Sequence, residues 1–554
     1  MAKVKKKRSI LKKLLLAFAG LILLLGIGAW IFFTYYFDDF VDARINSKLQ
    51  EATRTATHGL FRLVIGKVKY SAGSLYCTKV EMIRARYDSS ESGLTMKQLT
   101  ADSVSFKGLE IFDILRGKGL FMKRLQSNSA NILMTDVAEG RKELAGLPQD
   151  TIPIDTMMPV DLPAISYDSI ILSGISVTIP KQFAPAGIRG SYDGIRLVIS
   201  GFRLDDTTLH GPPLFVCKGI DLAMHSFPFD LADSSYVIDA VGAHVSVRDS
   251  LVTLDTFSFR SKLSEGEFAA KHRFATPMLA FSASGIRVEG IDFNSAFSHN
   301  SIDFRRLVVD SFYLDSYEDR RRPPNPHPTA VMFPNELISS FQGAINGGSI
   351  ALGRGDIRLR ERSKDGAGEL GFENVRITIA PIRKDSTHKS KRIPAVITLE
   401  ALFLKAPLDA TITYPLDQKR FDMDVHATLG SFDAHRLNPW LVPMERIKVR
   451  DGVLRSGKID MKVRNGIATT AVLPIYNEFG IEVLSASAGS KPGFTETIKT
   501  FISKTFIIRA NNPNGFGSTK TGVTTRKRLP DDQLFQFLWF AIRKSLGQVV
   551  GGFQ

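Results

Sequence analysis

The chain has 554 residues, of which 44% are hydrophobic and 23% charged, and its formal net charge is +16. This composition excludes a disordered chain and is sufficient for several domains or one elongated body. Only two cysteines occur, Cys77 and Cys217, so a disulfide-rich scaffold is excluded, and whether the two pair with each other stays open.

The N-terminal segment has the pattern of a membrane anchor. Seven Lys and Arg residues precede Leu14–Phe33, a run of twenty residues without a charge. About 20 apolar residues span a bilayer as a helix, and the basic flank stays on the cytoplasmic side. A cleaved signal peptide is the alternative, but its apolar part would be shorter. We therefore predict an uncleaved anchor that includes Leu14, Leu24, Trp30 and Phe33, with the rest of the chain outside the cytoplasm.

Beyond the anchor, the chain alternates between apolar and polar residues in short runs. The clearest run places Phe421, Met423 and Val425 on either side of the polar residues Asp422 and Asp424. A period of two puts one set of side chains on each face of a sheet. We predict that one apolar face is lined by these three residues and by nine others with the same alternation: Ile195, Leu197, Ile199, Val375, Ile377, Ile379, Ile459, Met461 and Val463.

Turn signals such as Asn465-Gly466 separate these runs, which indicates antiparallel hairpins. Residues 108–125 and 290–307 also share a pattern without gaps. The shared pattern predicts a repeated unit of strand, helical turn and strand. Chance similarity between two β-hairpins is the alternative explanation. At the far end, residues 531–550 have apolar positions at helical spacing. We predict an amphipathic helix there, which either caps the core or lies on a membrane.

Two proline-rich stretches, at residues 146–163 and 320–328, suggest joints between parts of the sheet. The sequence therefore predicts five segments. They are a basic tail and anchor at 1–37, a first β unit at 38–147, a central β region at 148–328, a second β region at 329–510 and a tail with the amphipathic helix at 511–554.

Catalytic motifs are missing from the sequence. The ten histidines are scattered, and the chain has no H-E-x-x-H motif, no G-x-S-x-G elbow and no Walker A loop. We therefore predict no enzyme, no cofactor, no metal site and no catalytic residue. An envelope enzyme whose site is assembled from distant residues is the least favoured alternative.

An apolar sheet face suits lipid tails. Each buried methylene contributes about 0.8 kcal/mol, so a C16 chain could gain on the order of 10 kcal/mol before ordering costs. Seven of the sixteen excess positive charges lie in the N-terminal tail, and the other nine suit anionic lipid headgroups. The alternatives are an ordinary closed core and a basic surface without a specific partner.

The chain also resembles a known family. The Ala101–Met134 block resembles the strand–helix–strand unit of the AsmA-like superfamily of bacterial envelope proteins, which includes TamB-related, bridge-like lipid transfer proteins, in its Bacteroidetes-type variety. The C-terminal residues that carry the resemblance are Gly430-Ser431-Phe432-Asp433, Leu437-Asn438-Pro439, Pro443, Ile447, Val449, Gly452, Leu454, Gly457, Met461 and Asn511-Asn512-Pro513.

The resemblance implies a mainly β fold: an N-terminal transmembrane helix, an elongated, curled antiparallel sheet with short helices, and a C-terminal amphipathic helix. It also implies a single-pass protein of the bacterial inner membrane whose bulk is periplasmic. The expected function is lipid binding or transfer in envelope homeostasis. The expected partners are the inner membrane, a phospholipid or other acyl lipid, and an outer-membrane or periplasmic protein, with no nucleic acid. The alternative function is a non-catalytic scaffold for outer-membrane assembly.

Overall fold

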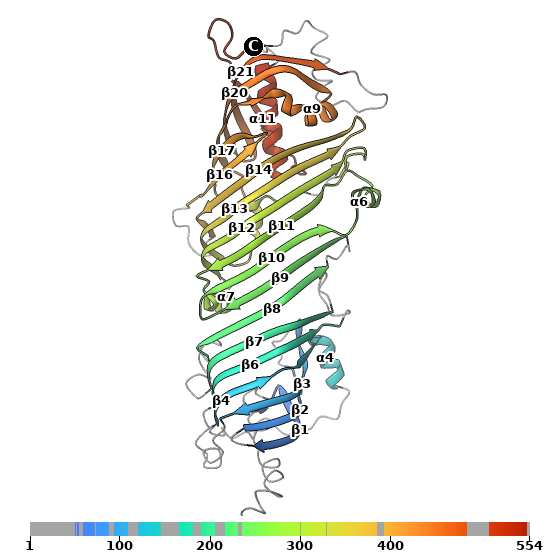
Figure 1. The fold of residues 1–554 in the computed structure, drawn as a ribbon, viewed down its shortest axis with the longest axis vertical. Helices are drawn as coiled ribbons and strands as arrows, with labels where there is room; N and C mark the ends of the chain where they lie inside the picture. The colour runs from blue at the N-terminus through green and yellow to red at the C-terminus, as the bar shows by residue number, and fades with distance from the viewer. Residues whose placement is uncertain are drawn as a thin grey trace, which may run out of the picture. The chain divides into compact units, whose positions relative to one another are not determined.

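The computed structural model describes a chain made mainly of strands (Figure 1). The described residues are 50, 53–54, 59–71, 74–87, 93–108, 120–145, 165–180, 190–204, 217–230, 235–299, 301–327, 330–384, 393–484 and 509–550. The predicted anchor residues Leu14, Leu24, Trp30 and Phe33 lie outside these ranges. Among the helices of the described ranges, none combines the length and the apolar character that a bilayer crossing requires.

The chain divides into two compact units. The first holds Met1–Pro185 and Arg189–Ala223, and the second holds Ala186–Ile188 and Met224–Gln554. The five segments expected from the sequence stay a prediction, because a compact unit and a functional segment need not have the same bounds.

The first unit is a twisted sheet over a small core. Its buried centre combines residues of the first four strands, among them Val68, Leu75, Cys77 and Phe106. Its elements are β1 (Phe61–Ser71), β2 (Ser74–Arg84), β3 (Leu94–Lys107), β4 (Leu120–Ser127), β5 (Ala130–Asp136), α4 (Val137–Ala145), β6 (Ile165–Thr178), β7 (Ser191–Leu204) and the start of β8 (Gly219–Asp230).

The second unit is a longer, curled sheet with short helices (Figure 1). Its strands before the C-terminal third are β9 (Tyr236–Ser246), β10 (Leu251–Ser261), β11 (Met278–Glu289), β12 (Ser301–Asp319), β13 (Ala344–Arg362), β14 (Ala367–Ala380), β15 (Ile382–Lys384), β16 (Ala395–Phe403) and β17 (Ala406–Tyr414). The later strands are β18 (Met423–Leu429), β19 (Phe432–Asp433), β20 (Ile447–Arg464), β21 (Ile467–Val483) and β22 (Gly522–Lys527). The helices are α6 (Glu265–Lys271), α7 (Phe293–His299), α8 (Pro334–Ser340), η4 (Ala434–Leu437), α9 (Asn438–Glu445) and α11 (Leu534–Val550).

Strand pairing is mixed, which corrects the prediction of an antiparallel sheet. In the first unit β4 and β5 both pair in parallel with β6, and in the second β12 pairs in parallel with β13 over its whole length. Parallel neighbours need a long crossover connection. The chain between β12 and β13 supplies one, and it contains the proline-rich stretch and α8.

Neighbouring β-bulges bend the strands of the second unit. The β13–β14 register shifts on both sides of Gly355, and Asn374 in β14 has a positive φ of 52° and donates its backbone N–H to Asp356 Oδ1 at 3.0 Å. A Cβ on Gly353 would lie 2.3 Å from the Asp310 carbonyl oxygen of the adjacent strand. Bulges at the same level of adjacent strands increase local twist and bend, so they account for the curl.

The predicted repeat is visible in the strand register of each unit. Lys107 of β3 pairs with Arg124 of β4, and Glu289 of β11 pairs with Arg306 of β12, which are the equivalent positions of the two copies. In both copies the second strand then pairs in parallel with a later strand. The helical turn of the second copy is α7, and that of the first copy lies outside the described residues.

Candidate functional site

The candidate site is built from apolar residues that stand opposite one another across the second unit. Starting in β12, each paired residue on the next strand is again apolar as far as β21. We call this set the first apolar row: Val309, Leu352, Ile377, Leu399, Ala410, Ala427, Ile459 and Val472. Because paired residues share a sheet face, the row is one line of side chains on one side of the sheet.

A second apolar row runs beside the first, two residues along each strand. Its members are Leu307, Ile350, Ile379, Ile397, Ile412, Val425 and Met461, and it ends at Thr470. The two rows together make a continuous apolar band on one face. The opposite face is polar: Thr378 pairs with Thr398, and Asp424 pairs with Lys462.

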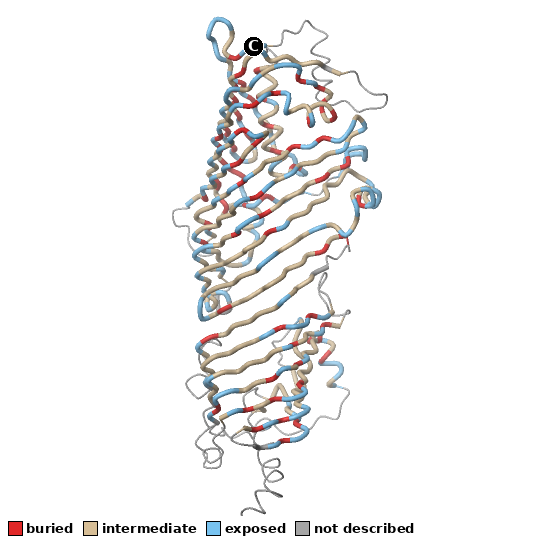
Figure 2. The backbone as a smooth tube through the Cα atoms, viewed as in Figure 1, coloured by how far each residue is buried: buried red, intermediate tan, exposed pale blue. Residues whose placement is uncertain are grey.

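Part of this band is covered by helices. Phe333, which precedes α8, and Phe537 and Ala541 of α11 join Met423, Met461 and other strand residues in one closed core. The ring of Phe537 lies 5.5 Å from that of Phe421 between centroids. We call this the helix-covered core. Figure 2 shows that buried residues recur along the strands of this unit.

The other part of the band is formed by strand residues, although Phe372 and Leu408 also pack in a cluster that includes Trp440 of α9. A separate cluster combines five buried residues, namely Ala283, Val309, Phe312, Val375 and Ala401, with nine larger side chains that stay half-buried. Those nine are Phe281, Ile286, Leu307, Leu352, Ile357, Phe372, Ile377, Leu399 and Leu408. Every member comes from β11, β12, β13, β14, β16 or β17. We call this set the strand-lined face.

The boundary between the two parts is the start of α11. Phe535 is 46% exposed, and its ring meets that of Phe372 edge-on at 6.0 Å between centroids. The first turn of α11 therefore reaches the strand-lined face, while the rest of its apolar side lies over the helix-covered core.

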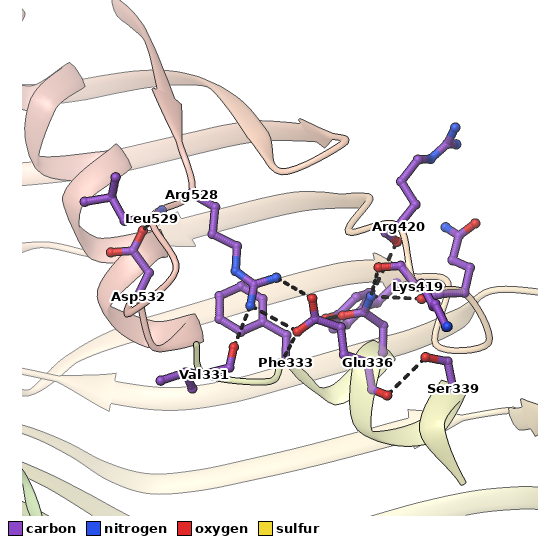
Figure 3. Close-up of polar contacts among 12 residues, drawn as sticks. Val331, Phe333, Glu336, Ser339, Lys419, Arg420, Arg528, Leu529 and Asp532 are labelled. Carbon is purple, nitrogen blue, oxygen red and sulfur yellow. Dashed lines mark hydrogen bonds and ion pairs between the residues drawn. The ribbon is translucent and has the colours of Figure 1, made fainter. Parts of the chain in front are cut away.

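A clamp around Arg528 holds the C-terminal segment in this position (Figure 3). The Arg528 guanidinium donates to both carboxylate oxygens of Glu336 at 2.8 and 3.0 Å and to the Val331 carbonyl at 2.6 Å. It also lies 3.5 Å above the Phe333 ring. Glu336 in turn accepts the backbone N–H of Phe333 at 2.7 Å, which closes the N-terminus of α8. The hydrogen bonds from Arg528 hold the pKa of Glu336 below its ordinary value.

Two buried polar residues complete the contact of α8 with the sheet. Asn335 is fully buried; it accepts a hydrogen bond from the Tyr414 hydroxyl at 2.6 Å and donates to the Gln418 carbonyl at 2.9 Å. Burial raises the pKa of Tyr414, so its hydroxyl stays a donor. Because both side chains are satisfied, they fix α8 against the loop before β18 rather than form a binding site.

A second polar cluster lies where β12 and β13 end beside α9 and α11. Arg320 pairs with Glu361 at 2.6 Å, and Arg543 of α11 pairs with Glu445 of α9 at 2.5 Å. Burial raises the pKa of Glu361 to about 7, against the opposing charge of Arg320. Burial also raises the pKa of Glu445 and lowers that of Arg543. The first pair joins the ends of β12 and β13, and the second joins α11 to α9.

The structure brings most of the predicted face residues of the second unit together. Ile377 and Ile459 lie on the first row, and Ile379, Val425 and Met461 lie on the second. Val375 belongs to the strand-lined face, while Phe421, Met423, Val425, Met461 and Val463 are buried in the helix-covered core. These five residues therefore belong to the part of the band that α8 and α11 cover.

The three predicted residues of the first unit form rows of their own. Leu197 pairs with Leu172 on one side and Leu222 on the other, and Ile199 pairs likewise with Ile170 and Ile220. Ile195 of the same strand is buried.

Several residues of the band were missed from the sequence. Ile397, Leu399 and Ala401 alternate with Thr398 and Glu400, and this run could have been identified by the same rule as its neighbours. The Arg528–Glu336 clamp had no sequence signal, because the two residues are 192 positions apart.

Other chemistry is limited within the described residues. No group of three or more His, Cys, Asp and Glu side chains there could hold a metal ion. Cys77 and Cys217 are thiols rather than the two halves of a disulfide. The site is therefore defined by apolar contact and strand register.

Comparison with known proteins does not identify the chain. No family model matches it, and no curated protein matches it. The similarity to AsmA-like proteins rests on the sequence motifs alone.

Proposed function

We propose that this protein binds the acyl chains of lipids along the apolar band of its second unit. The observation that carries the proposal is the strand-lined face: nine large apolar side chains that stay half-buried on one sheet face. Apolar patches of this kind on soluble surfaces usually mark binding sites. A ligand that needs no polar partner along its length suits a band whose members are all aliphatic or aromatic.

The dimensions of the band suit an acyl chain. The first row crosses β12, β13, β14 and β16 on the strand-lined face, from Val309 to Leu399. At about 4.8 Å between strands, these three steps cover about 14 Å. The hydrocarbon core of a bilayer is about 30 Å thick, so one leaflet of chains takes about 15 Å. One acyl chain that lies across the strands would therefore cover this part of the first apolar row.

The covered part of the band gives the proposed site an end. In the helix-covered core, the ring of Phe537 occupies the face that the strands would otherwise present. Phe535 stands at the boundary and contacts Phe372. An acyl chain bound on the strand-lined face would end where it meets α11.

The wider proposal follows the sequence resemblance. We propose an AsmA-like envelope protein, anchored in the bacterial inner membrane by its N-terminal segment, whose periplasmic part holds or transfers phospholipid. It has no catalytic step, and its expected partners are the inner membrane and a protein of the periplasm or outer membrane.

Photocrosslinking tests the proposed site. The full chain is incubated with a phosphatidylcholine that carries a diazirine in its acyl chain, irradiated and mapped by mass spectrometry. We expect crosslinks in peptides of β12, β13, β14 and β16 and few in peptides of β22. Crosslinks spread evenly over the chain, or confined to the N-terminal segment, would contradict the proposed site.

The second candidate is a closed scaffold that acts through protein contacts. The observation that favours it is the helix-covered core, where the same band is an ordinary filled interior. A chain that takes up no lipid in the crosslinking experiment, and carries none when purified from its membrane, would favour this scaffold over lipid binding.

A further inference from the structure

The outward face of the first unit carries an unusual excess of positive charge. Strands β1 to β4 contain only two carboxylates, Glu81 and Asp102. The exposed cations of the same strands number seven: Arg62, Lys67, Lys69, Lys79, Lys107, Lys123 and Arg124. This unit therefore has a strongly basic surface at its first strands.

Strand register places several of these cations on one side of the sheet. Lys69 pairs with Tyr76, and Lys107 pairs with Arg124. Lys107 also pairs with Ser74, which lies two residues before Tyr76 and so on the same face. Lys67 lies two residues before Lys69. We call Lys67, Lys69, Tyr76, Lys107 and Arg124 the basic face.

The opposite side of these strands is the core of the unit. Val68, Leu75 and Cys77 are buried there with Val104 and Phe106. A slip of the strand register by one residue would turn the cations inward and expose this core. The basic face is therefore held toward the outside of the unit by the packing of the core.

The cations of the basic face are not neutralised within the unit. Among the residues that the structure describes, Lys67, Lys69, Lys107 and Arg124 make no ion pair, whereas Lys97 of the same sheet pairs with Glu143 at 2.5 Å. Their charge is therefore directed at solvent or at a partner of opposite sign.

Exposed rings lie among these cations. Tyr76 is 44% exposed on β2, and Phe121 is 41% exposed on β4, two residues before the exposed Lys123. Aromatic side chains and cations together are typical of surfaces that rest on lipid headgroups, where the ring enters the interface and the cation meets phosphate. The strands also begin only 24 residues after the apolar N-terminal segment ends at Phe37.

We propose that the basic face docks on an anionic phospholipid surface. Because paired residues of neighbouring strands are about 4.8 Å apart, the face spans about 14 Å over four strands and contacts several headgroups at once. Near an anionic surface each Lys or Arg contributes about fivefold in affinity, so the four cations act together. Docking of this kind does not depend on acyl-chain binding by the second unit.

Lysine footprinting of the full chain tests this proposal. The chain is held in nanodiscs of phosphatidylglycerol or of phosphatidylcholine, and the acetylation rate of each lysine is measured by mass spectrometry. We expect Lys67, Lys69 and Lys107 to react at least about fivefold more slowly in phosphatidylglycerol at low salt. Salt near 1 M, where the Debye length is about 3 Å, should remove the difference. Equal rates in the two lipids would overturn the proposal.

Charge-neutral variants show whether the face acts as a unit. In the full chain with Lys67→Gln, Lys69→Gln and Arg124→Gln, Lys107 remains as the reporter, and we expect its protection in phosphatidylglycerol to be lost. Loss of three cations at about fivefold each predicts docking weaker by about 100-fold. Unchanged protection of Lys107 in this variant would contradict the proposal.

The control changes three exposed lysines of the second unit. The variant with Lys448→Gln, Lys462→Gln and Lys527→Gln has the same net charge as the first variant. We expect it to keep the protection of Lys107. If it loses protection equally, net charge rather than the basic face drives docking. A nucleic acid would be the better partner if single-stranded RNA protected the same lysines in phosphatidylcholine nanodiscs, and that outcome would also overturn the proposal.

Discussion

At the residue scale, the contacts that position α11 are charged pairs that lose water on folding. Arg528 and Glu336 form two hydrogen bonds, and their side chains are only 15% and 26% exposed. Hydrogen bonds to charged groups stabilise more than neutral ones, and removing one partner leaves the other without compensation. These two side chains join residues far apart in the sequence, so they contribute to tertiary structure rather than to a local turn.

Replacement of Glu336 by Gln should therefore weaken the whole C-terminal closure. We expect the free energy of unfolding to fall by about 2 kcal/mol at pH 7 in denaturant melts. Because the folded-state pKa of Glu336 is lowered, its contribution is present above the unfolded pKa and is lost as the pH falls through the folded pKa. The variant should thus approach the parent in stability at acid pH.

The control for this prediction is Glu400→Gln. Glu400 and Arg376 lie 3.7 Å apart with both side chains more than half exposed, and exposed pairs contribute little. A loss from Glu400→Gln as large as that from Glu336→Gln would mean that the clamp has no special role.

Glu361 should have the opposite pH dependence. Its pKa is raised to about 7 by burial, so the folded state holds a proton that the unfolded state releases near pH 4. Stability from this group falls as the pH rises from about 4 to 7. Glu361→Gln should be more stable than the parent at pH 8, on the order of 2 kcal/mol, and nearly equal at pH 4.

The charges around Glu361 make this a specific test. Arg320 and Glu318 face it from the end of β12, and Glu445 and Arg543 face it from α9 and α11. If Glu361→Gln is less stable than the parent at pH 8, the attraction to Arg320 outweighs the cost of burial. Glu369→Gln on the exposed side of β14 serves as the control, since Glu369 is 54% exposed.

At the element scale, α11 separates a closed part of the apolar band from the strand-lined face. Phe535 and Phe537 are two residues apart in the helix and therefore point to nearly opposite sides of it. Phe537 is fully buried, and Phe535 is 46% exposed. The helix spans Leu534–Val550, and Ala541, Ser545 and Val549 continue the buried side. This spacing matches one stripe of an amphipathic helix.

Truncation of the two phenylalanines should separate their roles. We expect Phe537→Ala to cost about 3 to 5 kcal/mol in denaturant melts, because it leaves a cavity against Phe333 and Phe421. Phe535→Ala should cost less than about 1.5 kcal/mol, since Phe535 is 46% exposed and meets the Phe372 ring edge-on. Equal costs would contradict the orientation of α11.

The edge strand β22 is also covered by α11. The backbone N–H of Val523 donates to Gln548 at 2.9 Å, and Lys544 donates to the Thr525 carbonyl at 3.0 Å. Edge strands with unpaired backbone groups tend to add further strands. Side chains of α11 thus occupy the groups through which this edge could pair with another chain.

At the scale of the whole molecule, alternation in the sequence predicts strands well but does not give their partners. The alternation predicts that Ile377 and Ile459 lie on apolar strand faces, and the strand register places both on the first apolar row. Alternation does not distinguish an open face from a filled one: Met423 and Ile377 follow the same pattern, yet only Met423 lies beneath α11.

Other features depend on tertiary contacts that have no local signal. Asp422 alternates like a solvent-facing residue, but it is only 6% exposed and accepts the backbone N–H of Asn465 at 2.8 Å. The parallel pairing of β12 with β13 follows from a crossover through α8, and the sequence predicted hairpins instead. The proline-rich stretch between those strands was a sign of the crossover.

The most direct test of acyl-chain binding compares two pairs of cross-strand substitutions in the full chain. Ile377 pairs with Leu399 on the strand-lined face, and Thr378 pairs with Thr398 on the opposite face of the same strands. Both pairs are changed to Asp, so each variant gains the same two charges. Thermal melts first confirm that both variants fold.

The measurement is the amount of phospholipid that remains bound to each purified chain, determined by quantitative mass spectrometry. Because charges on the strand-lined face would have to lose water beneath an acyl chain, Ile377→Asp with Leu399→Asp should reduce bound phospholipid at least about fivefold. Thr378→Asp with Thr398→Asp should retain the amount found in the parent. Equal retention by the two folded variants, or a parent chain without lipid, would contradict lipid binding on this face.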